Sequence, residues 1–195
     1  MARATAVSRS KAGADELTFR PVTSANLADF EAFFSAPGAP KHCWCMVWRR
    51  TAAEARLQAG SDRKRMMIQR ISAGVPVGLL AYSGSGPVGW VSVAPRDSHR
   101  AMGGPAAAAG EVVWSIVCFF VPRRLRGAGM VRRLLAAAID HARRQGATTI
   151  EAYPVDEDSP SFRFMGFIPV FAEAGFADLG MAGTRRHVMR LKVSG

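Results

Sequence analysis

Three arginines and two glycines lie close together between residues 123 and 129 and have the composition of a phosphate-binding turn. The segment is Arg123-Arg124-Leu125-Arg126-Gly127-Ala128-Gly129. It follows an apolar run and precedes an amphipathic one, so it lies where a strand would lead into a helix. Backbone N–H groups at a helix N-terminus bind phosphate groups. We therefore predict a site for a phosphorylated ligand at this turn.

A second segment with unusual chemistry is His42-Cys43-Trp44-Cys45-Met46-Val47-Trp48-Arg49-Arg50. Aromatic side chains give large, shaped contact areas, so Cys43, Trp44, Cys45 and Trp48 could line a substrate pocket. Packing in the hydrophobic core is an equally weighted alternative. His42, Cys43 and Cys45 are metal-ligand types, but a structural zinc needs four converging ligands and no partner pair is near in sequence. We therefore predict no metal site.

The elements that position the glycine turn are strongly patterned. Residues 112–121 form a continuous apolar run, which predicts a strand buried on both faces in the middle of a sheet and ended by Pro122. Apolar residues at helical spacing after Gly129 predict an amphipathic helix that Gln145-Gly146 closes. Residues 148–155 predict the next strand, and the intervening helix makes it parallel to the first.

The remainder of the chain predicts a frame for this unit. Alternating residues at 17–22 predict a strand, and Ser24 then begins a helix. We expect helices over residues 52–60 and 61–72, strands over 75–82 and 88–93 joined as a hairpin, and a final strand at 187–193. The small-residue segment 95–110 is either a freely varying loop or a flap over a site, with the loop favoured.

Length and composition limit the class of protein. The chain has 195 residues, 26 Lys plus Arg and 15 Asp plus Glu, which predicts one domain over residues 16–195 and attraction to anionic partners. Residues 1–15 are basic and without periodicity, so we predict a disordered tail. Three cysteines do not form a secreted disulfide framework, and no signal peptide or membrane span is visible. We expect a cytoplasmic protein.

Residues 120–131, followed by Leu134-Leu135, resemble the acetyl-CoA-binding signature of the GCN5-related N-acetyltransferase (GNAT) family. That signature is an Arg or Gln, two residues, a Gly, one residue, and then Gly or Ala. Arg124, Gly127 and Gly129 match it at every position. Arg126, Gly129 and Val131 match less well because of Val131, yet this frame keeps the family's spacing to the Leu pair, and we prefer it.

The resemblance extends over about residues 17–193 and implies a fold and a cosubstrate. The implied fold is an α/β (α+β) GNAT fold: a single mixed, mostly antiparallel sheet with a splayed parallel pair at its centre and helices on both faces. The implied cosubstrate is acetyl-CoA, whose pantetheine would lie in the splay as an extra strand. The implied cofactor-binding residues are Phe119, Phe120, Val121, Arg124, Arg126, Gly127, Ala128, Gly129, Met130 and Val131.

The resemblance leaves the catalytic groups open. Many family members have a general-acid Tyr where this chain has Phe171, so the proton for the leaving thiolate must come from water, the substrate or another residue. Tyr153 is the best-placed hydroxyl, and we name Tyr153 and Glu151 as the candidate catalytic residues. Further candidate bases are Glu111, Asp156 and Glu157. Phe171 joins the candidate substrate pocket, and Cys118 is expected to be a buried structural thiol.

The function that the resemblance implies is transfer of acetyl from acetyl-CoA to a primary amine of a small molecule or peptide by direct attack in a ternary complex. Such an enzyme would be a monomer or homodimer. The alternative is a protein of a different class on the same fold: a non-catalytic acyl-CoA sensor or a basic RNA-binding module. Nucleic acid is the less favoured partner, and we expect no membrane partner.

Overall fold

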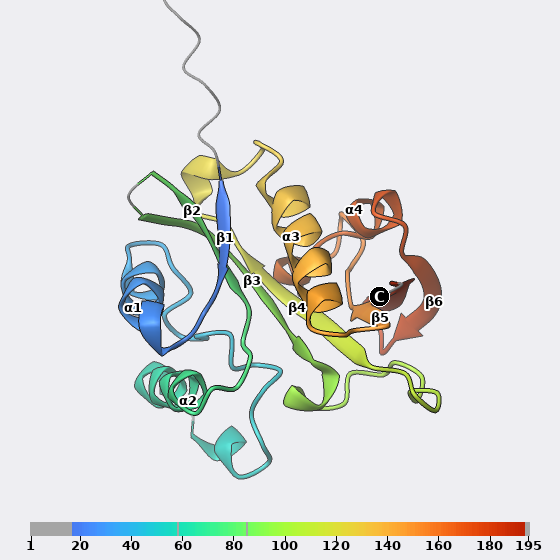
Figure 1. Cartoon of the computed structure of the whole chain (residues 1–195), viewed down its shortest axis with the longest axis horizontal. Helices are drawn as coiled ribbons and strands as arrows, with labels where there is room; N and C mark the ends of the chain where they lie inside the picture. The colour runs from blue at the N-terminus through green and yellow to red at the C-terminus, as the bar shows by residue number, and fades with distance from the viewer. Residues whose placement is uncertain (1–16, 58, 85, 194–195) are drawn as a thin grey trace, which may run out of the picture.

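A computed structural model describes residues 17–57, 59–84 and 86–193, and these residues form one mixed sheet flanked by helices (Figure 1). The predicted tail, residues 1–15, lies outside them. The sheet has seven strands in the order β1-β2-β3-β4-β5-β7-β6. The strands are β1 (Thr18–Pro21), β2 (Leu79–Ser83), β3 (Gly86–Pro95), β4 (Val113–Phe120), β5 (Thr149–Ala152), β6 (Ala177–Ala182) and β7 (Arg186–Lys192).

Helices cover both faces of the sheet. They are α1 (Leu27–Ser35), α2 (Gly60–Ser72), α3 (Met130–Arg144) and α4 (Ile168–Glu173). Figure 1 shows α1 and α2 together on one side of the strands and α3 on the other. Buried side chains accordingly form two core layers, one with Phe30 and Met67 from α1 and α2, and one with Leu134 and Phe171 from α3 and α4. Within the described ranges, no helix is both long and apolar enough to cross a membrane.

The strand directions confirm the fold class predicted from the sequence. β4 and β5 are parallel, and every other neighbouring pair is antiparallel. The parallel ladder is short, because it runs only from Val113 opposite Thr149 to Ile116 opposite Ala152. β4 then continues to Phe120, whereas Val155 after β5 bridges to Phe167 and Arg186 instead. The second half of β4 therefore has no ladder partner on that side among the described residues, which is the splay.

A bulge lies in β4 at the point where the splay begins. In the β3–β4 ladder Ser92 faces Cys118 but Val93 faces Ile116, so Val117 is an extra residue in β4. A bulge bends a strand and redirects its backbone groups. The bulge and the end of the parallel ladder thus coincide within one residue of each other.

Three elements differ from the sequence-based expectation. The helix predicted over residues 52–60 is wrong: only a single 3-10 turn forms, at Glu54–Arg56, because the segment is mostly exposed and has no apolar face to bury. β2 begins at Leu79 rather than at residue 75, since Pro76 has no N–H for a ladder. β6 was not predicted, because all but one of its residues are exposed and it has no apolar pattern.

Candidate active site

The glycine turn has a geometry that only its own residue types permit. A 3-10 turn at Arg123–Leu125 leaves β4, and Gly127 and Gly129 then adopt φ values of +81° and +71°. This left-handed backbone is costly for residues with a Cβ atom. Gly129 is the N-cap of α3, so no side chain caps the first turn of that helix. The N–H groups of the first turn are therefore left for a ligand.

The surroundings of the turn are open and positive. A Cβ atom at Gly127 or Gly129 would meet no atom within 4 Å, and α3 carries no acidic residue in its first turn. Arg126 Nε donates to the Val121 carbonyl at 3.1 Å, which ties the turn to the end of β4. Arg124 is exposed. The arginine charges and the positive end of α3 together suit a diphosphate group.

The two alignment frames of the turn place their third residue differently. Gly129 lies at the helix cap, whereas Val131 lies in the first turn of α3 and, with Met130, packs against the core layer under that helix. The extra carbon atoms of Val131 therefore contact the core. A Val at this position leaves the open space around Gly127 and Gly129 unfilled.

Side chains at the end of β4 alternate between the two core layers. Phe119 packs beside Phe171 with ring centroids 6.1 Å apart, while Phe120 packs against Phe33 at 5.1 Å on the opposite face of the sheet. Their backbone forms the edge of the splay. A chain-like ligand that lay along this edge would reach the bulge at Val117 from the glycine turn.

Tyr153 and Glu151 form a buried pair next to the splay. The Tyr153 hydroxyl donates to a Glu151 carboxylate oxygen. Arg190 Nε donates to the other oxygen at 2.7 Å, and Arg96 Nε lies 3.6 Å from the first. Burial raises the pKa of Tyr153 above its ordinary value, and the Glu151 charge and hydrogen bond raise it further. Tyr153 therefore stays protonated at neutral pH, and its proton points to Glu151.

The loop between β3 and β4 covers this pair. A Cβ atom on Gly104 would come within 2.2 Å of a Glu151 oxygen, so the loop backbone lies directly on the carboxylate. Arg96 donates to the carbonyls of Pro105 and Gly104 at 2.6 and 3.1 Å, and Arg190 donates to Pro105 at 2.7 Å. Glu151 is thus closed off from direct contact with a ligand.

A cavity of about 580 Å³ opens beside Tyr153, and we call it the acceptor cavity. Its lining includes Arg96, His99, Arg100, Met102 and Tyr153. Burial lowers the pKa of His99 well below its ordinary value, and the Arg49 charge lowers it further. The imidazole is therefore neutral at pH 7.

The structure separates the residues predicted to form a substrate pocket. Trp44 stacks on Phe34 in the core at 5.5 Å, and Cys45 Sγ accepts a hydrogen bond from Trp90 Nε1 at 3.0 Å. Cys43 is half-buried in the same segment, whereas Phe171 lies in the opposite core layer. Of the residues predicted to form the pocket, Trp48 alone is shown next to the acceptor cavity: Arg100 lines that cavity and stacks over the Trp48 ring.

The other predicted groups lie in varied environments. Glu111 is bound by Lys192 and Thr149, and Asp156 and Glu157 are exposed. Cys118 is buried, as a structural thiol would be. No cluster of three or more His, Cys, Asp or Glu side chains suited to a metal occurs within residues 17–57, 59–84 and 86–193.

Sequence reasoning missed the partners of Glu151 and the residues around the acceptor cavity. Arg96, His99, Arg100, Arg186 and Arg190 come from a loop and from β7, and nothing in their spacing marks them. One signal was available: Arg190 lies on an expected strand. A buried Glu151 carboxylate needs a charged or polar neighbour, and Arg190 is its neighbour across the ladder.

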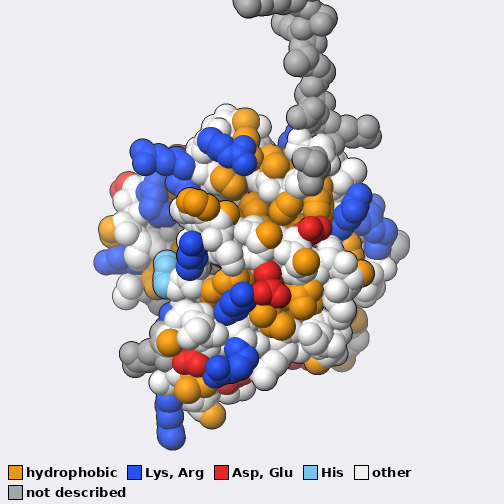
Figure 2. Space-filling view, turned by 90° about the vertical axis from the view of Figure 1, so that its left-hand side faces the viewer, with side chains coloured by type: hydrophobic (Ala, Val, Ile, Leu, Met, Phe, Trp, Pro, Cys, Tyr) orange, Lys and Arg blue, Asp and Glu red, His pale blue; other side chains and the backbone are white. Residues whose placement is uncertain are grey.

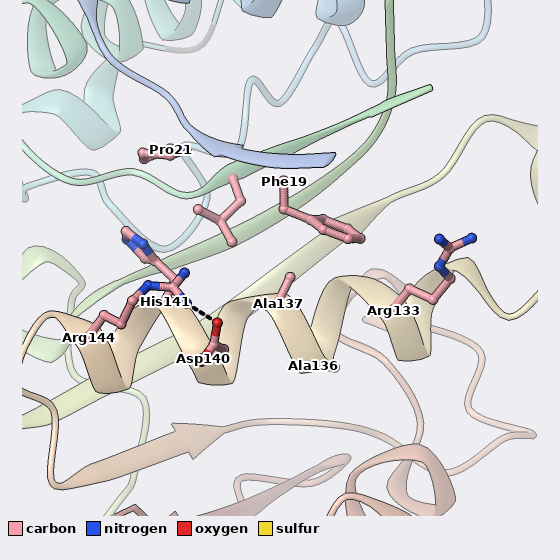
Figure 3. A pocket seen from close by; sticks show the side chains of 9 residues that line it. Phe19, Pro21, Arg133, Ala136, Ala137, Asp140, His141 and Arg144 are labelled. Carbon is pink, nitrogen blue, oxygen red and sulfur yellow. Dashed lines mark hydrogen bonds and ion pairs between the residues drawn. The ribbon is translucent and has the colours of Figure 1, made fainter. Parts of the chain in front are cut away.

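A second hollow, of about 520 Å³, lies away from these residues. Figure 3 shows it between β1, which contributes Phe19 and Pro21, and the outer side of α3, where Asp140 pairs with Arg144. It shares no lining residue with the acceptor cavity. We do not assign it to the active site.

Comparisons with known proteins agree on one family. The model of the acetyltransferase (GNAT) family matches residues 39–167. No curated protein matches the chain. Among solved structures, the yncA protein of Salmonella typhimurium, solved with its cofactor acetyl-CoA, matches with TM-score 0.53 and 18% identity over 92% of this chain and 95% of that one.

Two further solved structures are similar in fold. An N-acetyltransferase from Staphylococcus aureus Mu50 has TM-score 0.54 and 13% identity, over 92% of this chain and 99% of that one. A ribosomal-protein-alanine N-acetyltransferase from Brucella melitensis has TM-score 0.51 and 20% identity, over 90% of this chain and 99% of that one.

Proposed function

This chain belongs to the GNAT acetyltransferase family, and we propose that it is an N-acetyltransferase that uses acetyl-CoA to acetylate a primary amine of a small molecule or peptide. The observation that carries the proposal is the uncapped N-terminus of α3 behind two left-handed glycines with open space around them. This arrangement fits the diphosphate of acetyl-CoA, the cosubstrate that the family uses.

The residues that would hold acetyl-CoA follow from this arrangement. The N–H groups of residues 127–131, with Arg124 and Arg126, would bind the pyrophosphate. The backbone of residues 119–121 would pair with the pantetheine amides along the splayed half of β4. Acetyl-CoA supplies a thioester carbon that is open to attack by an amine. A backbone N–H at the Val117 bulge would donate a hydrogen bond to the thioester carbonyl oxygen of acetyl-CoA.

Tyr153 is our proposed catalytic residue, and Glu151 acts through it. The Tyr153 proton is directed to Glu151, and the Ser115 hydroxyl donates to one lone pair of the Tyr153 oxygen, so one lone pair is left for a ligand in the cavity. That oxygen would accept a hydrogen bond from the incoming amine and orient the nitrogen lone pair toward the thioester. When the C–N bond forms and the thioester C–S bond breaks, the proton that the amine loses would go to the leaving CoA thiolate. Arg190 and Arg96 hold the Glu151 carboxylate in place. Glu151 is therefore a positioning residue.

The alternative of a basic RNA-binding module receives no support from the face of the molecule that Figure 2 shows. On the side that carries α1 and α2, Lys and Arg side chains occur in separate groups with acidic residues between them (Figure 2). A continuous positive stripe is the usual footprint of a nucleic-acid interface. That face does not show one.

The proposal is tested by release of the CoA thiol from acetyl-CoA with a panel of primary amines. We expect release that depends on the amine, together with an acetylated product in the mass spectrum. A purified protein whose melting temperature rises with acetyl-CoA but which acetylates no amine would be a sensor, and that outcome would refute the enzymatic proposal.

A further inference from the structure

Two arginines stack on the same indole beside the acceptor cavity. Arg100 Cζ lies 4.6 Å and Arg186 Cζ lies 4.7 Å from the centre of the Trp48 ring. The Arg100 N–H also donates to the Trp48 carbonyl at 2.9 Å, which fixes the loop of the cavity to this tryptophan. Arg186 Cζ is 5.9 Å from the Tyr153 ring as well. The Arg186 charge therefore lies beside the ring of the proposed catalytic tyrosine, and Arg100 lines the same cavity as that tyrosine.

Two carboxylates, those of Asp97 and Glu111, line the acceptor cavity, but within the described residues neither forms an ion pair with these arginines. Neither Arg100 nor Arg186 forms an ion pair there, and the side chain of Arg186 donates only to the Met102 carbonyl, at 3.3 Å. Burial lowers the pKa of Arg186, and the like charge of Arg100 lowers it further. The half-buried Arg186 guanidinium and the exposed Arg100 guanidinium stack on the same ring, and two like charges in this arrangement favour a shared anion beside that ring.

A third donor at the same place lacks a partner. Trp48 Nε1 is buried and has no hydrogen-bond partner within the described part of the chain. An unpaired buried N–H costs about 1–3 kcal/mol. Native proteins rarely leave such a group without a protein, water or ligand partner.

We propose that the acetyl acceptor is a small amine that carries a carboxylate, and that Arg100 and Arg186 bind this carboxylate beside Trp48. The inference rests on the proposed N-acetyltransferase function. A guanidinium matches a carboxylate through two parallel hydrogen bonds. A carboxylate held at Arg186 places a neighbouring amine next to Tyr153. The cavity of about 580 Å³ has the size of a small-molecule site, and a peptide N-terminus has no carboxylate adjacent to its amine.

The test compares acceptors that differ only in charge. CoA release is measured with free α-amino acids, with the corresponding amino-acid amides, and with short peptides whose C-termini are amidated. We expect kcat/KM for the acid to exceed that for its amide by about 10- to 100-fold, as for one or two charge-assisted hydrogen bonds. The peptides should behave like the amides.

Substitutions assign this preference to the two arginines. Arg100→Met and Arg186→Met should each reduce the acid-to-amide ratio by about tenfold or more, mainly through KM. Arg186→Lys keeps the charge but loses the planar fork, so its ratio should lie between those of the wild type and Arg186→Met. Arg20→Met is the matched control, because Arg20 stacks on the Tyr82 ring at 5.0 Å on an edge strand far along the sheet, and it should leave the ratio unchanged.

The outcomes separate this inference from the function it rests on. Equal kcat/KM for acids, amides and peptides would overturn the inference and leave the transferase intact, as would Arg100→Met and Arg186→Met enzymes with the wild-type ratio. Absence of CoA release with every amine would overturn both. The melting shift with acetyl-CoA, measured for each variant, verifies folding, and the exposed Arg100 supports the test by itself if Arg186→Met is unfolded.

Discussion

Replacing Gly129 with Ala should separate the role of the glycine turn in binding from its role in stability. Gly129 lies at the N-terminal end of α3 with φ +71°, and Gly146 lies just beyond its C-terminal end with φ +84°. A Cβ atom at either position would meet no atom within 4 Å. The two sites therefore carry the same backbone strain and no steric clash, which makes Gly146→Ala a matched control.

The expected effects follow from this symmetry. A left-handed backbone costs about 1–2 kcal/mol for a residue with Cβ, so each variant should lose about that much stability without ligand. For a chain of this length that is a decrease in Tm of about 2–8 °C. Only the Gly129→Ala methyl group occupies space where the pyrophosphate would approach the backbone. The loss of one charge-assisted hydrogen bond, about 1.5–3 kcal/mol, would weaken binding by about 10- to 100-fold.

Thermal melting with and without acetyl-CoA measures both effects. At a concentration of about 100 times the wild-type Kd, acetyl-CoA stabilises the protein by about 2.7 kcal/mol. For Gly129→Ala this stabilisation should fall to about 0.4–1.4 kcal/mol, while Gly146→Ala should keep the wild-type value. An equal acetyl-CoA shift in Gly129→Ala and in the wild type would refute the assignment of this turn to the pyrophosphate.

Three further predictions concern the catalytic pair and its surroundings. Tyr153→Phe should lower kcat/KM by about 10- to 100-fold and keep the acetyl-CoA melting shift, whereas Tyr82→Phe, at the only other tyrosine, should keep both. Gly104→Ala should lower activity because its methyl group would overlap the Glu151 carboxylate. Gly110→Ala in the same loop meets no atom within 4 Å, and its φ of +76° should cost stability rather than activity, so a loss of activity equal to that of Gly104→Ala would contradict this. The Lys192 ammonium, with Thr149, lowers the pKa of Glu111 from 4.5 to about 2, so Glu111 adds stability above pH 4.5 that is lost as the pH falls toward 2. Melting of Glu111→Gln should therefore show a deficit at pH 7 that disappears near pH 2, and a deficit that is constant with pH would exclude this ion pair as its source.

The sequence predicted the elements whose patterns depend on local physics. The apolar run at 112–121 predicted a strand buried on both faces, and the amphipathic run after Gly129 predicted a helix between two parallel strands. Both were confirmed. By contrast, residues 52–60 contain helix-forming residues but no apolar face, and propensity without burial does not sustain a helix.

The candidate site was less predictable because its contacts join distant residues. The partners of Glu151 lie on β7 and in the loop after β3, and neither Arg190 nor Arg96 has a local pattern that marks it. Two interpretations of the His42 to Arg50 segment had equal weight: several of its side chains line one pocket, or they pack in the core. Composition cannot tell which side of such a segment faces the core, and the structure places only Trp48 beside the cavity.

The four-pair ladder between β4 and β5 is also a place where the sheet could open by local unfolding. β1 to β4 are paired in chain order on one side of it, and β5, β7 and β6 make up the other side, so each half holds mostly its own hydrogen bonds. Such halves tend to behave as separate cooperative units in local unfolding. Opening at this ladder would expose two strand edges together. The centre of the sheet, in addition to its outer strands β1 and β6, would then present unpaired backbone groups.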